Sequence, residues 1–206
     1  MKYSLYDIYP SGIFNGYGID YAKKRFAVLK EIPHFNSILD VGSGPCFLKQ
    51  WIEENFTHNI EYEAVDIRQD ALDLCDCPKY NTIPSNKTYD LTCLFGTVTY
   101  NIDFETNKNK QLLKDLLIQS KTVSKQILFT VFKDDQLNTI SEKRKSQFVF
   151  YTKNEIKEML DELGLKIKNI EKTFRRNVET DVYEYDPWYL SFEYDRFEYF
   201  ILCESK

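Results

Sequence analysis

Apolar residues recur along the chain with two spacings, and their alternation predicts strands separated by helices. Short apolar runs of strand length occupy residues 37–41, 62–66, 80–83, 89–95, 126–132, 165–173 and 197–203. Apolar residues at helical spacing lie between most of these runs, at residues 20–32, 47–52, 70–75, 112–117 and 156–163. Such an alternation is typical of a mainly parallel sheet with helices on both faces.

The last of these predicted helices has a signal at each end. Thr152-Lys-Asn-Glu155 has the form of a capping box, in which a threonine oxygen and a glutamate satisfy unpaired backbone donors. Gly164 follows the helix and supplies the left-handed residue that often ends one.

A glycine loop follows the first predicted strand, in Asp40-Val-Gly42-Ser-Gly44-Pro-Cys46. Glycines let a backbone approach a ligand closely, and N–H groups at a helix start can face a carboxylate or hydroxyl. Asp66 ends the next strand, at the spacing expected of a carboxylate that accepts hydrogen bonds from ribose hydroxyls. Together these features predict an adenosine-containing ligand. Phe47 stands where a dinucleotide fingerprint has its third glycine, which disfavours NAD.

Four motifs, in this order along the chain, resemble those of class I S-adenosylmethionine-dependent methyltransferases. They lie at residues 38–46 (ILDVGSGPC), 64–67 (AVDI), 88–91 (TYDL) and 150–164. The resemblance covers residues 20–173 and the last strand. It implies a Rossmann-like, doubly wound α/β fold with a seven-stranded sheet of order 3-2-1-4-5-7-6, in which strand 7 is antiparallel. S-Adenosylmethionine would then lie across the carboxyl ends of strands 1, 2 and 4.

The resemblance assigns cofactor-binding roles to residues of the first two motifs. Asp40, Gly42 and Gly44 match the family's first motif and would flank the methionine and ribose portions of the cofactor. Asp66 matches the acid that binds the ribose, and Ile67 matches the apolar contact to adenine.

Four further positions are assigned to the cofactor with some departure from the family pattern. Cys46 stands where a third glycine is common. The usual acid after strand 3, which meets the adenine amino group, is absent, and Asn81 is the substitute because an amide also offers an acceptor. Phe95 and Gly96 match the stretch after strand 4 that passes beside the sulfonium.

Candidate catalytic residues follow strand 4. Methyl transfer from a sulfonium is an in-line displacement that depends mainly on positioning, and a base is needed only for a hydroxyl or a protonated amine. Tyr100 and Asp103 lie on the expected ligand side, with a solvated loop as the alternative interpretation. His34 and His58 each precede a strand, at the opposite edge of the sheet, so we expect neither to be catalytic.

Two aromatic segments are candidates for a substrate lid: the N-terminal residues 1–20 and an insertion at 175–196 between strands 6 and 7. The predicted substrate residues in them are Tyr17, Glu184, Tyr185, Asp186 and Trp188. Aromatic faces beside carboxylates can hold a cationic amine, and they can equally stack on a sugar. The alternative is that these aromatics form the buried face of a β-hairpin or a dimer surface.

Length and charge narrow the choice of partner. A chain of 206 residues without a repeat or linker predicts one domain over residues 1–206. The net charge of −5 provides no basic field for a phosphate backbone, so a small-molecule substrate is favoured and nucleic acid is unlikely. No apolar run reaches the ~20 residues that a bilayer requires, and no signal peptide is visible. We expect no membrane partner, and a homodimer is left open.

Five irregularly spaced cysteines predict reduced thiols and a cytoplasmic location. Cys75-Asp-Cys77 lacks the partner pair of a zinc site, so no metal is expected.

Phe95-Gly-Thr-Val98 is not the Pro-Pro-Tyr type of motif found in adenine- and amide-nitrogen methyltransferases, and those activities are disfavoured. The sequence predicts methyl transfer to an O or N atom of a metabolite, sugar or natural-product intermediate. The alternatives are an RNA or protein methyltransferase, or a non-catalytic protein that binds S-adenosylmethionine.

Overall fold

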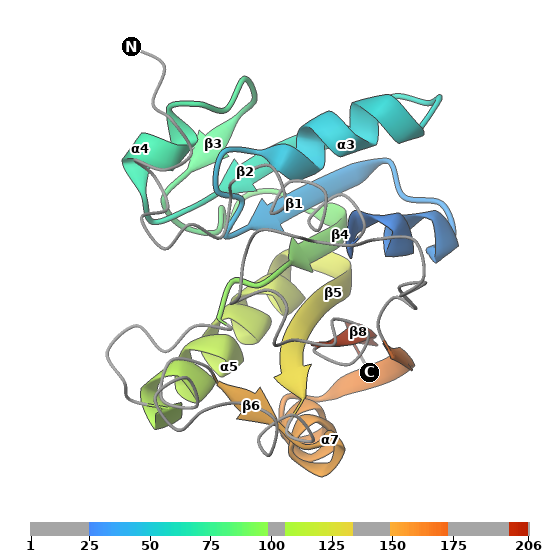
Figure 1. Ribbon diagram of the computed structural model, residues 1–206, viewed down its shortest axis with the longest axis vertical. Coiled ribbons are helices and arrows are strands. Elements are labelled where there is room, and N and C mark those ends of the chain that lie inside the picture. Colours follow the sequence, from blue (N-terminus) through green and yellow to red (C-terminus); the bar gives the residue numbers. More distant parts are fainter. Residues whose placement is uncertain (1–24, 99–105, 134–148, 173–197, 206) are drawn as a thin grey trace, which may run out of the picture. The chain divides into compact units, whose positions relative to one another are not determined.

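A computed structural model describes residues 25–98, 106–133, 149–172 and 198–205 (Figure 1). The strands are β1 (Ser37–Val41), β2 (Glu61–Val65), β3 (Lys79–Tyr80), β4 (Tyr89–Leu94), β5 (Ser124–Lys133), β6 (Phe150–Tyr151), β7 (Leu165–Lys172) and β8 (Glu198–Ser205). The helices are α3 (Phe47–Asn55), α4 (Gln69–Leu72), α5 (Thr106–Val123) and α7 (Lys153–Glu162), preceded by the 3-10 helix η1 (Ala27–Glu31). None of the helices in these ranges is both long enough and apolar enough to cross a membrane.

The strands form a mixed sheet with the order β3-β2-β1-β4-β5-β8-β7. β8 is antiparallel to both β5 and β7, whereas β1 pairs in parallel with β2 and β4. The predicted α/β fold class and strand order are confirmed, with one difference. The two-residue strand β6 pairs in parallel with β5 and makes the sheet eight-stranded, which shifts the numbering of the last two strands. Two residues show no periodicity, so the sequence pattern could not reveal β6.

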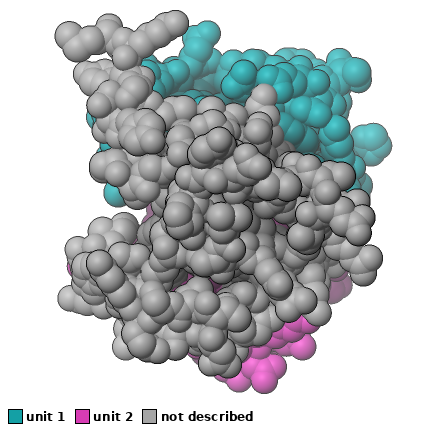
Figure 2. Space-filling model, viewed as in Figure 1, with its two compact units in different colours: residues 1–95, 123–125 teal, residues 96–122, 126–206 magenta. Residues whose placement is uncertain are grey.

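The chain divides into two compact units, residues 1–95 with 123–125 and residues 96–122 with 126–206 (Figure 2). The expectation of a single domain stays a prediction.

The core of the first unit is built around β1. Ile38 of β1 pairs with Leu91 of β4, and neither side chain is accessible to solvent. The predicted stripe on α3 is confirmed, because Leu48, Trp51 and Ile52 are buried. The amphipathic helix predicted at 20–32 differs in form, because its described part ends in the 3-10 turn η1 before Pro33, but its apolar residues Phe26, Leu29 and Ile32 are buried.

The second unit contains most of β5, the longest of the described strands, and the capped helix α7. Ile127, Leu128 and Phe129 of β5 are consecutive and almost fully buried, so both faces of this strand are covered. The capping box of α7 is confirmed: Thr152 Oγ1 accepts a hydrogen bond from Glu155 N (3.0 Å), and Glu155 Oε2 accepts one from Thr152 N (2.7 Å). Gly164 follows α7 with a φ of +62°, as predicted.

Candidate functional site

The loop after β1 folds over the carboxyl end of β2. Gly42 N and Ser43 N both donate hydrogen bonds to Val65 O, at 2.7 and 3.1 Å. Gly42 and Gly44 have φ values of 76° and 52°, a left-handed conformation that glycine adopts without strain. Because these two positions carry no side chain, a ligand can approach the loop backbone closely at the end of the parallel strands, where ligands of open α/β sheets bind.

Asp66 lies directly after β2 and is held in place by backbone donors. Its Oδ2 accepts a hydrogen bond from Gly44 N and its Oδ1 accepts one from Arg68 N, both at 2.9 Å. Asp66 N in turn donates to Tyr80 O of β3 (3.1 Å). Each carboxylate oxygen keeps a further lone pair, so this side chain can also accept hydrogen bonds from two neighbouring hydroxyls. The Asp66 carboxylate therefore has the acceptor capacity that the predicted contact to ribose requires.

Asp40 is a second carboxyl group at this end of the sheet, and it is buried. Tyr62 of β2 donates a hydrogen bond of 2.5 Å from its hydroxyl to Asp40 Oδ2. Burial raises the pKa of Asp40 to about 7, with a smaller contribution from the charge of Asp66, while the Tyr62 bond acts in the opposite direction. Burial also raises the pKa of Tyr62, so Tyr62 stays the donor. Asp40 can therefore be neutral or ionised near neutral pH, and a nearby cation would favour its ionised form.

Ile67 and Asn81 follow β2 and β3 at the same edge. The Ile67 side chain is 82% exposed and provides an apolar surface beside Asp66. Asn81 Nδ2 donates to the carbonyl oxygen of Asp66 (3.2 Å), a bond that does not use the amide oxygen. Both placements suit contacts to a purine base.

Phe95 and Gly96 follow β4 and belong to different units. The Phe95 ring makes an edge contact with Phe26, with ring centroids 5.3 Å apart. Gly96 has a φ of 70°, and its N–H donates to Thr130 Oγ1 of β5 (2.9 Å).

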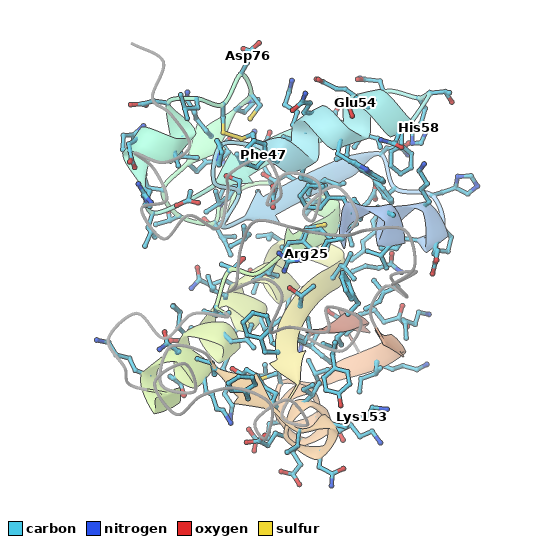
Figure 3. The ribbon with its side chains drawn as sticks, in the orientation of Figure 1. Arg25, Phe47, Glu54, His58, Asp76 and Lys153 are labelled. Carbon is cyan, nitrogen blue, oxygen red and sulfur yellow. A yellow bond between two sulfur atoms is a disulfide. The ribbon has the colours of Figure 1, made fainter. Side chains whose placement is uncertain are left out.

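The two histidines lie away from the glycine loop. His34 precedes β1 and is exposed, whereas His58 precedes β2 with its Nε2 3.3 Å from Phe35 O. Figure 3 shows His58 and Glu54 near the end of α3, opposite to Phe47 at its start.

The predicted catalytic and substrate residues, together with both lid segments, lie outside the described residues: Tyr100, Asp103, Tyr17, Glu184, Tyr185, Asp186 and Trp188.

The prediction that the cysteines are all reduced thiols is wrong for two of them, because Cys46 and Cys75 form a disulfide. They are 29 residues apart and share no motif. They meet because β1, β2 and β3 are adjacent in the sheet, which brings the loop after β1 beside the segment that leads into β3. Cys77, Cys93 and Cys203 are thiols.

Tyr62 was not predicted as the hydrogen-bond partner of Asp40. The signal lies in the strand pairing: Ile38 is opposite Tyr62, and Asp40 is two residues further along β1, on the same face. A correct register between β1 and β2 would therefore have identified this hydrogen bond.

The chain matches no protein-family model, and no curated protein is similar to it in sequence. Its fold, however, is shared by solved structures. A chain from the complex between the Haloferax volcanii Trm112 methyltransferase activator and a putative methyltransferase has a TM-score of 0.68 at 10% identity, with 98% of this chain and 97% of that chain covered. An S-adenosylmethionine-dependent methyltransferase from Clostridium acetobutylicum has a TM-score of 0.61 at 14% identity, with 98% and 96% covered.

This chain has the class I methyltransferase fold. A third neighbour, magnesium protoporphyrin IX methyltransferase from Synechocystis, was solved with bound S-adenosylhomocysteine. It has a TM-score of 0.58 at 9% identity, with 92% of this chain and 82% of that chain covered. At such identities the similarity defines the fold, and the substrate has to be inferred from the residues of this chain.

Proposed function

We propose that this chain is a methyltransferase that binds S-adenosylmethionine at the loop after β1 and transfers its methyl group to an O or N atom of a small molecule. The observation that carries the proposal is the Asp66 carboxylate, which Gly44 N and Arg68 N hold at the carboxyl end of β2. This feature occurs in a sheet with the strand order of the methyltransferase fold.

The residues of the first unit fit the parts of this cofactor. Asp66 binds the ribose hydroxyls, while Ile67 covers one face of the adenine and the Asn81 amide oxygen accepts from its amino group. Gly42 and Gly44 give the methionine portion access to the loop backbone.

Other assigned residues contribute in different ways. Asp40 is nearly inaccessible to solvent, so it acts from behind the loop rather than as a direct ligand, and the positive charge of the cofactor favours its ionised form. The side chain of Cys46 is bonded to Cys75, so only its backbone remains for the cofactor. Phe95 and Gly96, after β4, flank the sulfonium in this proposal.

Bound S-adenosylmethionine supplies a methyl group activated by a sulfonium. The task of the protein is to exclude water and to align the acceptor atom with that methyl carbon. Tyr100 and Asp103, which follow β4, are the proposed groups that orient the acceptor and remove its proton where it carries one.

Charge and aromatic content support a small-molecule acceptor. The chain carries a net charge of −5, which opposes binding to a nucleic acid. The segments at 1–20 and 175–196 are the proposed lid, with Tyr17, Tyr185 and Trp188 as walls and with Glu184 and Asp186 as anchors for a cationic acceptor. We propose a cytoplasmic enzyme whose partner is this small molecule, with a homodimer as the assembly to test.

Transfer of a labelled methyl group tests this proposal. The chain is incubated with S-adenosylmethionine labelled in the methyl group and with a cell extract that has been separated by size into metabolites and macromolecules. The proposal predicts label in the metabolite fraction for the wild type and little label for Asp66→Ala. Label only in the macromolecular fraction would support the RNA or protein alternative, and cofactor binding without any transfer would support a non-catalytic role.

A further inference from the structure

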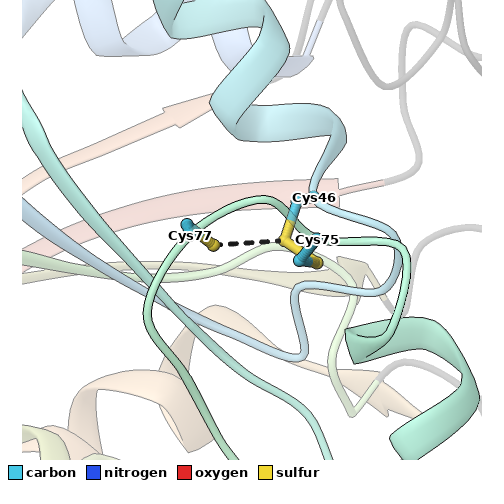
Figure 4. Close-up of side chains that lie close together, drawn as sticks. All are labelled: Cys46, Cys75 and Cys77. Atoms are coloured by element: carbon cyan, nitrogen blue, oxygen red, sulfur yellow. Dashed lines mark hydrogen bonds between the residues drawn. A yellow bond between two sulfur atoms is a disulfide. The ribbon is translucent and has the colours of Figure 1, made fainter.

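Three cysteine sulfur atoms meet behind the glycine loop, although they come from two separate segments. Cys46 ends the loop after β1, whereas Cys75 and Cys77 lie between α4 and β3. Their Sγ atoms all lie within 4.8 Å of one another, and Cys77 Sγ is 3.9 Å from Cys46 Sγ (Figure 4). Cys46 therefore supplies a third sulfur atom to the two that the Cys75-Asp-Cys77 segment provides on its own.

Backbone hydrogen bonds hold these residues in place independently of the disulfide. Cys46 N donates to Ser43 O (3.1 Å), and Cys75 N donates to Leu72 O (2.9 Å). Lys79 Nζ donates to the carbonyl oxygens of Leu72 and Cys75, at 2.9 and 3.1 Å, which ties down the turn that carries Cys75. Reduction of the disulfide would thus leave three thiols close together.

The spacing of the sulfur atoms suits a tetrahedral cation. Two thiolates on one tetrahedral zinc, with Zn–S bonds of about 2.3 Å, are about 3.8 Å apart. The 3.9 Å between the Sγ atoms of Cys46 and Cys77 already matches this value. Cys75 Sγ would have to move away from Cys46 Sγ to a similar separation, and rotation about its own Cα–Cβ bond can supply that movement.

We propose that Cys46, Cys75 and Cys77, when reduced, bind a thiophilic divalent cation of the zinc class, with water as the fourth ligand. Cys77 is half-buried, so solvent reaches the cluster. The disulfide between Cys46 and Cys75 is the oxidised, metal-free state of the same site. A dithiol reductant gives two electrons and two protons to the disulfide and itself becomes a disulfide; the cation then replaces the three thiol protons.

The cation would sit against the loop that we assign to the cofactor. Cys75 Sγ lies 3.4 Å from Gly44 O, and the N–H of Gly44 binds Asp66. The metal site itself is nevertheless independent of the proposed function, because its ligands and its test involve neither cofactor nor substrate.

Titration with Co²⁺ tests the proposal on the full chain. The protein is reduced with a phosphine, desalted without oxygen and titrated, because Co²⁺ replaces Zn²⁺ and gives strong visible and thiolate charge-transfer bands in a tetrahedral thiolate site. We expect one equivalent of Co²⁺ to bind, Zn²⁺ to displace it, and Cys77→Ser to weaken binding by at least about 100-fold, more than the loss of an outer-shell partner. The Cys203→Ala variant, which changes a cysteine of the second unit, is the matched control and should bind like the wild type.

A second measurement needs no variant. Alkylation of the reduced wild type, read by mass spectrometry, should show that Zn²⁺ protects Cys46, Cys75 and Cys77 and leaves the labelling of Cys93 and Cys203 unchanged. The proposal is overturned if the reduced wild type shows no stoichiometric charge-transfer band. It is equally overturned if the oxidised protein binds Co²⁺ as tightly, or if Zn²⁺ does not protect these three residues.

Discussion

Replacement of Asp40 by asparagine is expected to raise the free energy of unfolding, relative to that of the wild type, by an amount that grows as the pH rises. The Asp40 carboxyl is buried against Tyr62, and its pKa is raised from 3.8 to about 7. An acid whose pKa is higher in the folded state than in the unfolded state favours folding fully only below the unfolded value, and this advantage is lost as the pH rises toward the folded value. Asparagine keeps an acceptor for the Tyr62 hydroxyl but does not ionise, so the variant avoids this loss.

The size of the effect follows from the two pKa values. Each unit of pKa difference corresponds to about 1.4 kcal/mol, so a shift from 3.8 to about 7 amounts to about 4 kcal/mol in full. Between about pH 4.5 and about pH 8, where part of the unfolded-state ionisation has already occurred, about 3 kcal/mol of this remains. The free energy of unfolding of Asp40→Asn minus that of the wild type should therefore increase by about 3 kcal/mol over this range.

Urea unfolding of both proteins at the two pH values measures this difference, and contributions from titrating groups that do not interact with Asp40 cancel in it. Asp90→Asn is the matched control. The pKa of Asp90 is lowered by the Lys125 ammonium (2.6 Å) and by the N–H of Asn36 (2.8 Å), so Asp90 stays ionised above about pH 4.5 and its replacement should have a nearly constant effect. A difference for Asp40→Asn that is equally independent of pH would refute the reasoning.

Two further predictions concern the capped helix and the lid. Thr152→Ala removes the acceptor for Glu155 N and should lower the free energy of unfolding, measured by urea titration, by about 1 kcal/mol. Asn154→Ala, at an exposed position of the same turn, is the control and should leave the free energy of unfolding unchanged. Equal losses in the two variants would contradict the role of the cap. The pair Glu184→Gln/Asp186→Asn and the single change Trp188→Ala should reduce turnover of a cationic acceptor while leaving the affinity for S-adenosylhomocysteine unchanged. A fall in that affinity, or unchanged turnover in both variants, would remove these residues from the lid.

The sheet could be predicted from the sequence because its strands are short apolar runs bounded by glycine, proline and charged residues. β1 and β5 are buried almost throughout, and both appear in the sequence as nearly continuous apolar segments. The capping box of α7 was equally visible, because its two hydrogen bonds depend on residues only three positions apart.

Contacts between distant segments were the part that the sequence could not provide. The bond between Cys46 and Cys75 depends on how the loop after β1 and the segment before β3 fold at the edge of the sheet, and the contact between Tyr62 and Asp40 depends on strand register. Local periodicity contains neither kind of information. The positions of Asp66 and the glycine loop were predictable because strand, loop and carboxylate follow one another within a single βαβ unit.

Calorimetric titration with S-adenosylhomocysteine, in the presence of a chelator, tests the central claim most directly. We expect binding in the micromolar range, roughly −8 kcal/mol, by the wild type. Asp66→Ala should weaken it by about 1.5–3 kcal/mol, the range for hydrogen bonds to a charged group. Asp73→Asn, which changes an exposed carboxylate that accepts a hydrogen bond from the Gln69 amide one turn earlier, should bind like the wild type. An absence of S-adenosylhomocysteine binding, or an unchanged affinity in folded Asp66→Ala, would contradict the account.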